Sequence, residues 1–175
     1  MGIPAITCKQ IKEWKYLCRL YLQSMTTFTI NIDKAGVLEE VAKTTSYIGK
    51  KKDDKQDTGA YERIFTTDAD NEMLERFWQE ACSEVACLLR PFIAGTINID
   101  GFTVLLDMPK AFDMELKDTI NKSLRSYIVN EIVGKWSLLT NKEEINDYKR
   151  MASVYLADAK SKLFYRKRPT RSRIF

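Results

Sequence analysis

Apolar residues recur every three or four positions along most of this chain, which is the spacing of helices that bury one face. The strongest pattern predicts a helix from Thr67 to about Leu89, opened by an acidic first turn. A second helix is predicted from about Asp113 to Val133, ended by Gly134, and a last one to about Lys167, opened by the capping box Thr140-x-x-Glu143. The three apolar stripes are Leu74, Phe77, Trp78, Ala81, Val85, Leu88 and Leu89, then Leu116, Ile120, Leu124, Tyr127, Ile128 and Ile132, and then Ile145, Tyr148, Ala152, Tyr155, Leu156, Ala159 and Leu163.

The N-terminal stretch also has a helical pattern. Thr7 and Gln10 form a capping box, and a helix is predicted from Cys8 to about Gln23. Its apolar stripe is wide enough to pack on two sides or against another subunit. If Met25 is an alternative start, residues 1–25 are an appended helical extension. The stripe consists of Ile11, Trp14, Cys18, Tyr21 and Leu22, widened by Leu17 and Leu20.

A strand and a shorter helix come next. Residues 26–32 alternate between apolar and polar, which predicts a strand. Asp33 is placed to cap a helix that runs to about Ser46 and stops near Gly49. Residues 50–60 have mixed charge and almost no apolar side chains, so we expect a solvated loop there.

Two further alternating runs separate the long helices, in the stretch GTINIDGFTVLLDMP at residues 95–109. Asp100 and Gly101 lie between the runs, and Asp-Gly is favoured in tight turns whose central residues need positive φ. We therefore predict a β-hairpin. It either projects to contact a neighbouring subunit through Asp100, Gly101 and Phe102, or folds back onto its own helices.

These patterns predict a mainly α fold: a bundle of about five helices with one β-hairpin and one additional short strand. Residues 1–25 are interpreted as an N-terminal helical extension, residues 26–165 as a single helical domain, and residues 166–175 as a basic C-terminal arm.

The composition is that of a globular protein, with 45% hydrophobic and 30% charged residues among 175. No apolar run approaches the roughly 20 residues of a membrane span, and the N-terminus lacks a signal-peptide pattern. The chain contains no histidine, which removes the commonest general base and metal ligand. A zinc site would need all four cysteines, with unusual spacings. We expect Cys8, Cys18, Cys82 and Cys87 to be small buried hydrophobic residues instead.

No feature of the sequence requires catalysis, a metal or a cofactor. Phosphate-binding, dinucleotide-binding and nucleophile-elbow motifs are absent. Asp68, Asp70 and Glu72 could bind a cation, but a first helical turn already favours acidic residues. The three tryptophans could form a ligand cage, although aromatic residues at helical spacing usually belong to a core.

Positive charge is concentrated at the C-terminus. Residues 160–175 contain seven of the chain's 28 basic residues and no acid, which leaves 21 basic against 24 acidic residues elsewhere. Such a segment can dock on an acidic protein surface, bind a nucleic-acid backbone or remain a solvated end. The terminal apolar pair favours docking on protein. The residues expected to bind a partner are Arg166, Lys167, Arg168, Arg171, Arg173, Ile174 and Phe175.

Residues 67–175 follow one order of predicted elements. A long helix with an acidic first turn comes first (TTDADNEMLERFWQEACSEVACLLRPF), then a hairpin, and then two helices that lead to a basic arm (AKSKLFYRKRPTRSRIF). In architecture and size this stretch resembles the head–tail connector, or portal-adaptor, proteins of tailed bacteriophages. The resemblance implies a non-enzymatic ring, commonly of twelve subunits, stacked under the portal around the DNA channel. In such proteins a C-terminal arm often grips the portal, and the N-terminal extension of this chain departs from the pattern.

From this resemblance we expect a structural virion protein at the head–tail junction, present in the host cytoplasm before assembly. Its expected partners are copies of itself, the portal, other tail or connector proteins, and DNA passing through without sequence-specific contacts. No membrane is expected to take part. The alternative is a small DNA-binding accessory protein that uses the basic C-terminal arm.

Overall fold

The computed structural model describes residues 25–53 and 59–166. Within them the chain is mainly helical with one two-stranded antiparallel sheet, so the predicted fold class is confirmed. The helix predicted at Cys8 to Gln23 and the arm beyond Arg166 lie outside the described residues.

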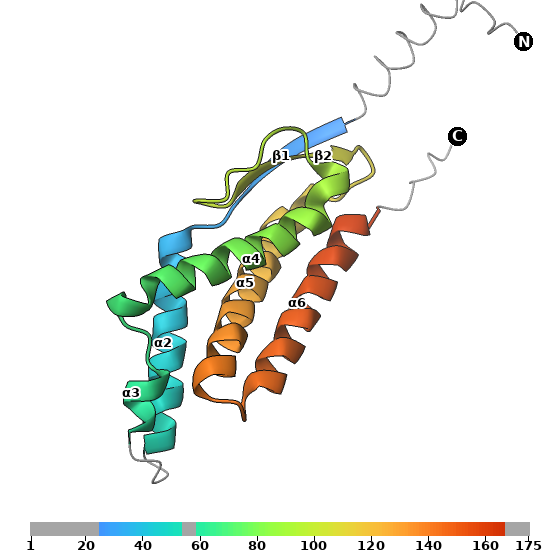
Figure 1. Ribbon diagram of the computed structural model, residues 1–175. Coiled ribbons are helices and arrows are strands. Elements are labelled where there is room, and N and C mark those ends of the chain that lie inside the picture. The colour runs from blue at the N-terminus through green and yellow to red at the C-terminus, as the bar shows by residue number, and fades with distance from the viewer. Residues whose placement is uncertain (1–24, 54–58, 167–175) are drawn as a thin grey trace, which may run out of the picture.

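Three helices form the body of the fold, and a fourth crosses them (Figure 1). Helix α5 lies between α2 and α6 and contacts both, while α4 crosses α5. Short 3₁₀ turns lie on both sides of α4 and before α5, at Asp68–Asp70, Arg90–Phe92 and Met114–Leu116. The main elements are β1 (Met25–Asn31), α2 (Lys34–Asp53), α3 (Ala60–Ile64), α4 (Asn71–Leu89), β2 (Thr103–Pro109), α5 (Lys117–Thr140) and α6 (Ile145–Phe164).

The sheet joins β1 to β2, with Met25 opposite Pro109 and Asn31 opposite Thr103. Both strands alternate as the sequence predicted: Phe28, Ile30, Val104, Leu106 and Met108 face the core. The predicted partner of β2, the run around Ile97 and Ile99, contributes a single bridge from Asn98 to Thr103. The seven-residue ladder with β1 is the longer pairing.

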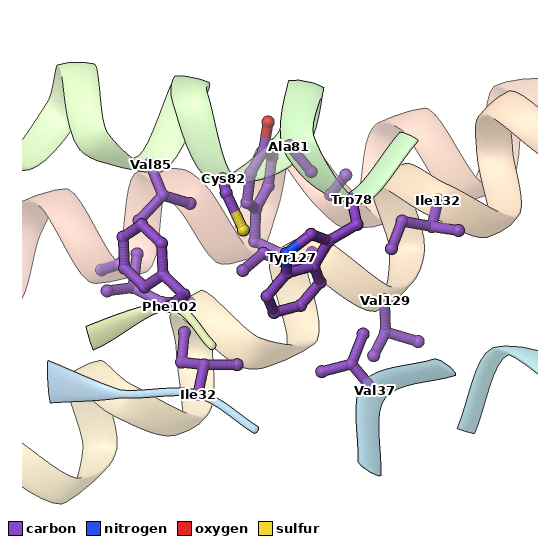
Figure 2. Close-up of a cluster of buried hydrophobic side chains, with 14 of the residues drawn as sticks. Ile32, Val37, Trp78, Ala81, Cys82, Val85, Phe102, Tyr127, Val129 and Ile132 are labelled. Carbon is purple, nitrogen blue, oxygen red and sulfur yellow. The ribbon is translucent and has the colours of Figure 1, made fainter. Parts of the chain in front are cut away.

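Trp78 lies at the centre of the core, where α4 meets α5 and the start of α2 (Figure 2). Its side chain is fully buried, and around it lie residues from α2, α4, α5 and the strand ends. The labelled neighbours are Ile32, Val37, Ala81, Cys82, Val85, Phe102, Tyr127, Val129 and Ile132. The apolar stripes of α4 and α5 that the sequence predicted therefore meet in one core.

Helix α2 does not stop at Gly49, contrary to the sequence prediction, but continues to Asp53. Gly49 is buried against α3, where an added Cβ would lie 2.8 Å from the Cα of Tyr61. The glycine permits a close crossing of two helices rather than ending one of them. Asp33 caps α2 as predicted, because its carboxylate accepts a hydrogen bond from the backbone N–H of Gly36 at 2.8 Å.

The predicted boundary between the last two helices was also wrong. Helix α5 passes through Gly134 to Thr140, and the Thr140 hydroxyl donates to the carbonyl of Trp136 rather than capping α6. Helix α6 begins at Ile145, after Glu144. Gly134 faces α6, where an added Cβ would lie 3.5 Å from the Cβ of Tyr148. Here too the glycine marks helix packing.

Candidate functional site

The loop at Asp100 and Gly101 was predicted to contact a neighbouring subunit. The backbones of Asn98 and Thr103 exchange hydrogen bonds of 3.1 and 2.9 Å, so four residues form the loop instead of two. Gly59 is the glycine with positive φ among the described residues, which means that Gly101 does not adopt the conformation that the Asp-Gly signal predicted. An added Cβ at Gly101 meets no atom within 4 Å.

The same loop folds back onto its own subunit. Phe102 is fully buried in the core, so its side chain does not lie on the surface. The indole of Trp78 donates a 2.8 Å hydrogen bond to the carbonyl of Ile99. Of the three predicted interface residues, the structure therefore leaves Asp100 and, partly, Gly101 accessible.

The proposed C-terminal binding residues are described only at their first member. The guanidinium of Arg166 donates to the carbonyls of Leu163 and Tyr165, each at 2.8 Å. This arrangement satisfies carbonyls at the end of α6 with a cation, as is favourable at a helix C-terminus. Lys167, Arg168, Arg171, Arg173, Ile174 and Phe175 lie outside the described residues, and their role stays a prediction.

One cluster joins a hydroxyl, an amine and a carboxylate between α5 and α6. Ser123 donates to Asp158 at 2.6 Å, while Lys162 donates to Ser123 at 3.1 Å and also pairs with Asp158. The hydrogen bonds from Lys162 and Ser123 lower the pKa of Asp158. Because Lys162 is held as a donor, it is not placed as a base for the hydroxyl. The cluster ties two helices together.

The acidic turn before α4 has a structural role as well. The carboxylate of Asp70 accepts hydrogen bonds from the backbone N–H of Thr67 at 2.8 Å and from its hydroxyl at 2.9 Å, which forms a capping box. Within the described part of the chain, no three His, Cys, Asp or Glu side chains gather to hold a metal ion. None of the helices in residues 25–53 and 59–166 combines the length and hydropathy needed to cross a bilayer.

The cysteines differ from one another. Cys82 is buried beside Trp78, and this burial raises the pKa of its thiol to about 12. Cys87 is exposed, so the prediction that it is buried was wrong. The reason is its position: α4 turns Val85 and Leu89 inward, and Cys87 lies on the opposite side of the helix. Cys8 and Cys18 lie outside the described residues.

The tryptophans do not form a cage. Trp136 is buried at 6% exposure, and its indole donates to the carbonyl of Ile64 at 2.6 Å, whereas Trp78 donates to Ile99. Each indole therefore packs in the core and holds a neighbouring backbone segment by a hydrogen bond. Trp14 lies outside the described residues.

Sequence reasoning missed a groove of about 530 Å³ between α2 and α6, with α5 as its floor. Tyr127 and Lys135 of α5 contact α4, through Glu84 and Glu80 respectively. Positions two residues apart on a helix point in nearly opposite directions. Val129 and Val133, which line the groove, therefore point away from the side of α5 that carries Tyr127 and Lys135. The apolar part of its lining consists of Val129, Val133, Tyr148, Met151 and Tyr155.

Carboxylates border this groove. Glu40, Glu144 and Asp147 line it together with one basic residue, Lys51. Arg125 pairs with Glu40, and Arg150 pairs with Asp147 at 3.2 Å, while Glu144 has no ion-pair partner among the described residues.

The negative charge at this end of the groove affects the pKa of one tyrosine. Burial, followed by the charges of Glu144 and Asp147, raises the pKa of Tyr148. No sequence signal could have identified the groove, because its α2 wall lies far from α5 and α6 in the chain.

Several large apolar side chains are exposed toward the C-terminal end of the described chain. Five of the eleven such residues in residues 25–53 and 59–166 fall on the last turn of α5, on the parts of α6 outside the groove and on the residue after α6. They are Leu138, Leu139, Val154, Phe164 and Tyr165, and Val154 and Leu139 are each 61% exposed. Leu138 and Leu139 lie just before α6 begins, whereas Phe164 and Tyr165 lie where it ends, so these side chains are spread along the length of α6.

Comparison with known proteins adds no relative: no family model, no curated protein and no solved structure matches this chain.

Proposed function

We propose that this chain is a structural subunit of a tailed-phage particle, a head–tail connector that forms a ring between portal and tail around the DNA channel. The observation that supports the proposal is a set of exposed apolar side chains along α6 and at the end of α5, at Leu138, Leu139, Val154, Phe164 and Tyr165. A subunit that works by assembly keeps such surface for its neighbours.

A closed ring requires two different surfaces on each subunit, because one patch of a subunit meets another patch of the next. The apolar surface on α6 is one candidate. The basic C-terminal arm, with its terminal Ile174 and Phe175, makes a separate contact: we propose that it docks on an acidic face of a neighbouring protein in the stack, the portal first among them. The protein would then be in the host cytoplasm before assembly and in the virion afterwards.

The chemistry of the described residues is compatible with a role other than catalysis. The hydroxyl–amine–carboxylate cluster at Ser123 links α5 to α6 by hydrogen bonds. The thiol of Cys82 is buried, and its pKa is raised. Assembly needs neither a nucleophile nor a metal.

The test is the oligomeric state of the full chain, measured by size-exclusion chromatography with light scattering, alone, with preassembled portal and with DNA. We expect a ring-sized species with portal and no shift with DNA. Val154→Lys should weaken assembly, because it places a charge among the exposed apolar side chains of α6, whereas Ser83→Lys on the exposed side of α4 adds the same single charge elsewhere and is the matched control. Failure to bind portal at any concentration would refute the proposal.

The second candidate is a DNA-binding accessory protein, favoured by the seven basic residues and no acid in residues 160–175. Two of the seven are already engaged within the subunit, since Lys162 pairs with Asp158 and Arg166 binds helix-end carbonyls. This candidate predicts a monomer that binds DNA with a steep dependence on salt. The DNA titration in the same experiment measures it.

A further inference from the structure

The groove between α2 and α6 leaves apolar side chains of α6 exposed or only partly covered among the described residues. Met151 in its wall is 41% exposed, and Tyr148 and Tyr155 are partly buried beside it. A volume of about 530 Å³ bordered by three helices is wide enough to receive side chains from another helix. The question is which chain segment fills it.

We infer that residues 8–23 of the same chain occupy this groove as a helix running antiparallel to α5. The sequence of this segment predicts an amphipathic helix whose wide apolar stripe, at Ile11, Trp14, Leu17, Cys18, Tyr21 and Leu22, must be buried against something. The inference is independent of the ring proposed above, since it concerns contacts within one subunit.

The position of Met25 favours the same chain as the source. Met25 begins β1 opposite Pro109, and the ring of Phe28 stacks on that of Phe112 at 5.5 Å between centroids. This places the start of β1 at the same end of the molecule as the start of α5 (Figure 1). The segment preceding Met25 therefore enters at the start of α5.

The length of the segment matches the path along α5. A helix from Cys8 to Gln23 spans about 24 Å at 1.5 Å per residue. The path along α5 from Lys117 to Val133, the last α5 residue in the groove, is also about 24 Å. A helix folded back from Met25 would thus cover the groove to its far end.

The charges agree with this orientation. The segment carries Lys9, Lys12, Lys15 and Arg19 against a single acid, Glu13. In the antiparallel arrangement its first turns, with Lys9 and Lys12, lie toward the far end of the groove. That end is bordered by Glu144, which has no ion-pair partner among the described residues, and by Asp147, which also pairs with Arg150. Oppositely charged groups would border a buried apolar stripe.

A lysine cross-linking experiment tests the placement without any substitution. Lys51 lines the groove, so a short amine-reactive linker on the full chain should join Lys51 to Lys9 or Lys12. An equal mixture of ¹⁴N- and ¹⁵N-labelled chains distinguishes the source by mass spectrometry. We expect links within one label. Links between labels would put a second copy's segment in the groove and overturn the assignment, as would the absence of links from Lys51 to the segment.

A matched pair of variants tests the contact itself. Met151→Lys places a charge in the groove, and Val154→Lys places the same charge on α6 outside it; both positions are exposed on the same helix. Trypsin should cut after Lys12, Lys15 and Arg19 about tenfold faster in Met151→Lys than in the wild type, because cleavage follows the population of the open form. Trypsin should cut the same sites in Val154→Lys at the wild-type rate. Equal rates in all three proteins, with unchanged circular dichroism, would overturn the inference.

Discussion

Two buried glycines in helices should respond in opposite ways to the same added methyl group. At Gly49 a Cβ would lie 2.8 Å from the Cα of Tyr61 and 3.3 Å from its carbonyl oxygen, so the backbone of α3 would have to move. At Gly134 the nearest atom, the Cβ of Tyr148, would lie 3.5 Å away, which is ordinary van der Waals contact. Gly134→Ala should therefore stabilise the protein and Gly49→Ala should destabilise it.

The magnitudes follow from two terms. Replacing glycine by alanine inside a helix gains about 1 kcal/mol in either case. Overpacking a fixed contact costs about 1–3 kcal/mol, and this cost applies to Gly49→Ala alone. We expect Gly134→Ala to be more stable than wild type by up to about 1 kcal/mol, and Gly49→Ala to be less stable by up to about 2 kcal/mol.

Urea and thermal unfolding followed by circular dichroism measure both variants, with a shift in Tm of about 2–4 °C for each kcal/mol in a chain of this size. Gly101→Ala is the control, because its added Cβ meets no atom within 4 Å and lies outside the helices. If Gly49→Ala proves as stable as Gly134→Ala, the close contact between Gly49 of α2 and Tyr61 of α3 does not form in the protein.

Three other measurements probe the core and the ties between elements. Trp78→Phe should cost about 2 kcal/mol in urea unfolding, since it removes the hydrogen bond to the loop and leaves a cavity; no loss would show that this bond does not hold the loop. The pKa of Asp158 is lowered in the fold by Lys162 and Ser123, so its contribution is present above the unfolded pKa near 4 and is lost as the pH falls through the lower folded value. The stability difference between wild type and Asp158→Asn should thus be constant near neutral pH, at about 1 kcal/mol or less, and shrink below about pH 4; a difference that grows on acidification would contradict this. A thiol reagent should label Cys87 rapidly in the native protein and leave Cys82 unlabelled until unfolding, as mass spectrometry of the labelled peptides would show.

Local signals predicted much of the fold. The apolar stripe of α4 and the acidic turn that opens it involve residues within a few positions of one another, and both occur as predicted. Alternation over β1 and β2 identified the face of each strand that is buried. The cap at Asp33 depends only on the next three residues. These features can be predicted from the sequence, because helix periods, strand periods and caps depend on residues that are close together in the chain.

The tertiary structure alone decided which strand pairs with β2 and what the glycines do. The signal at Asp100 and Gly101 was local and predicted a tight hairpin, but β1, more than seventy positions earlier in the chain, forms the longer ladder. Gly49 and Gly134 resemble helix ends in the sequence, yet each lies where a second helix approaches closely. The groove between α2 and α6 likewise exists only once α5 lies between them. These outcomes depend on which distant surfaces bury the most apolar area together, and no window of neighbouring residues contains that information.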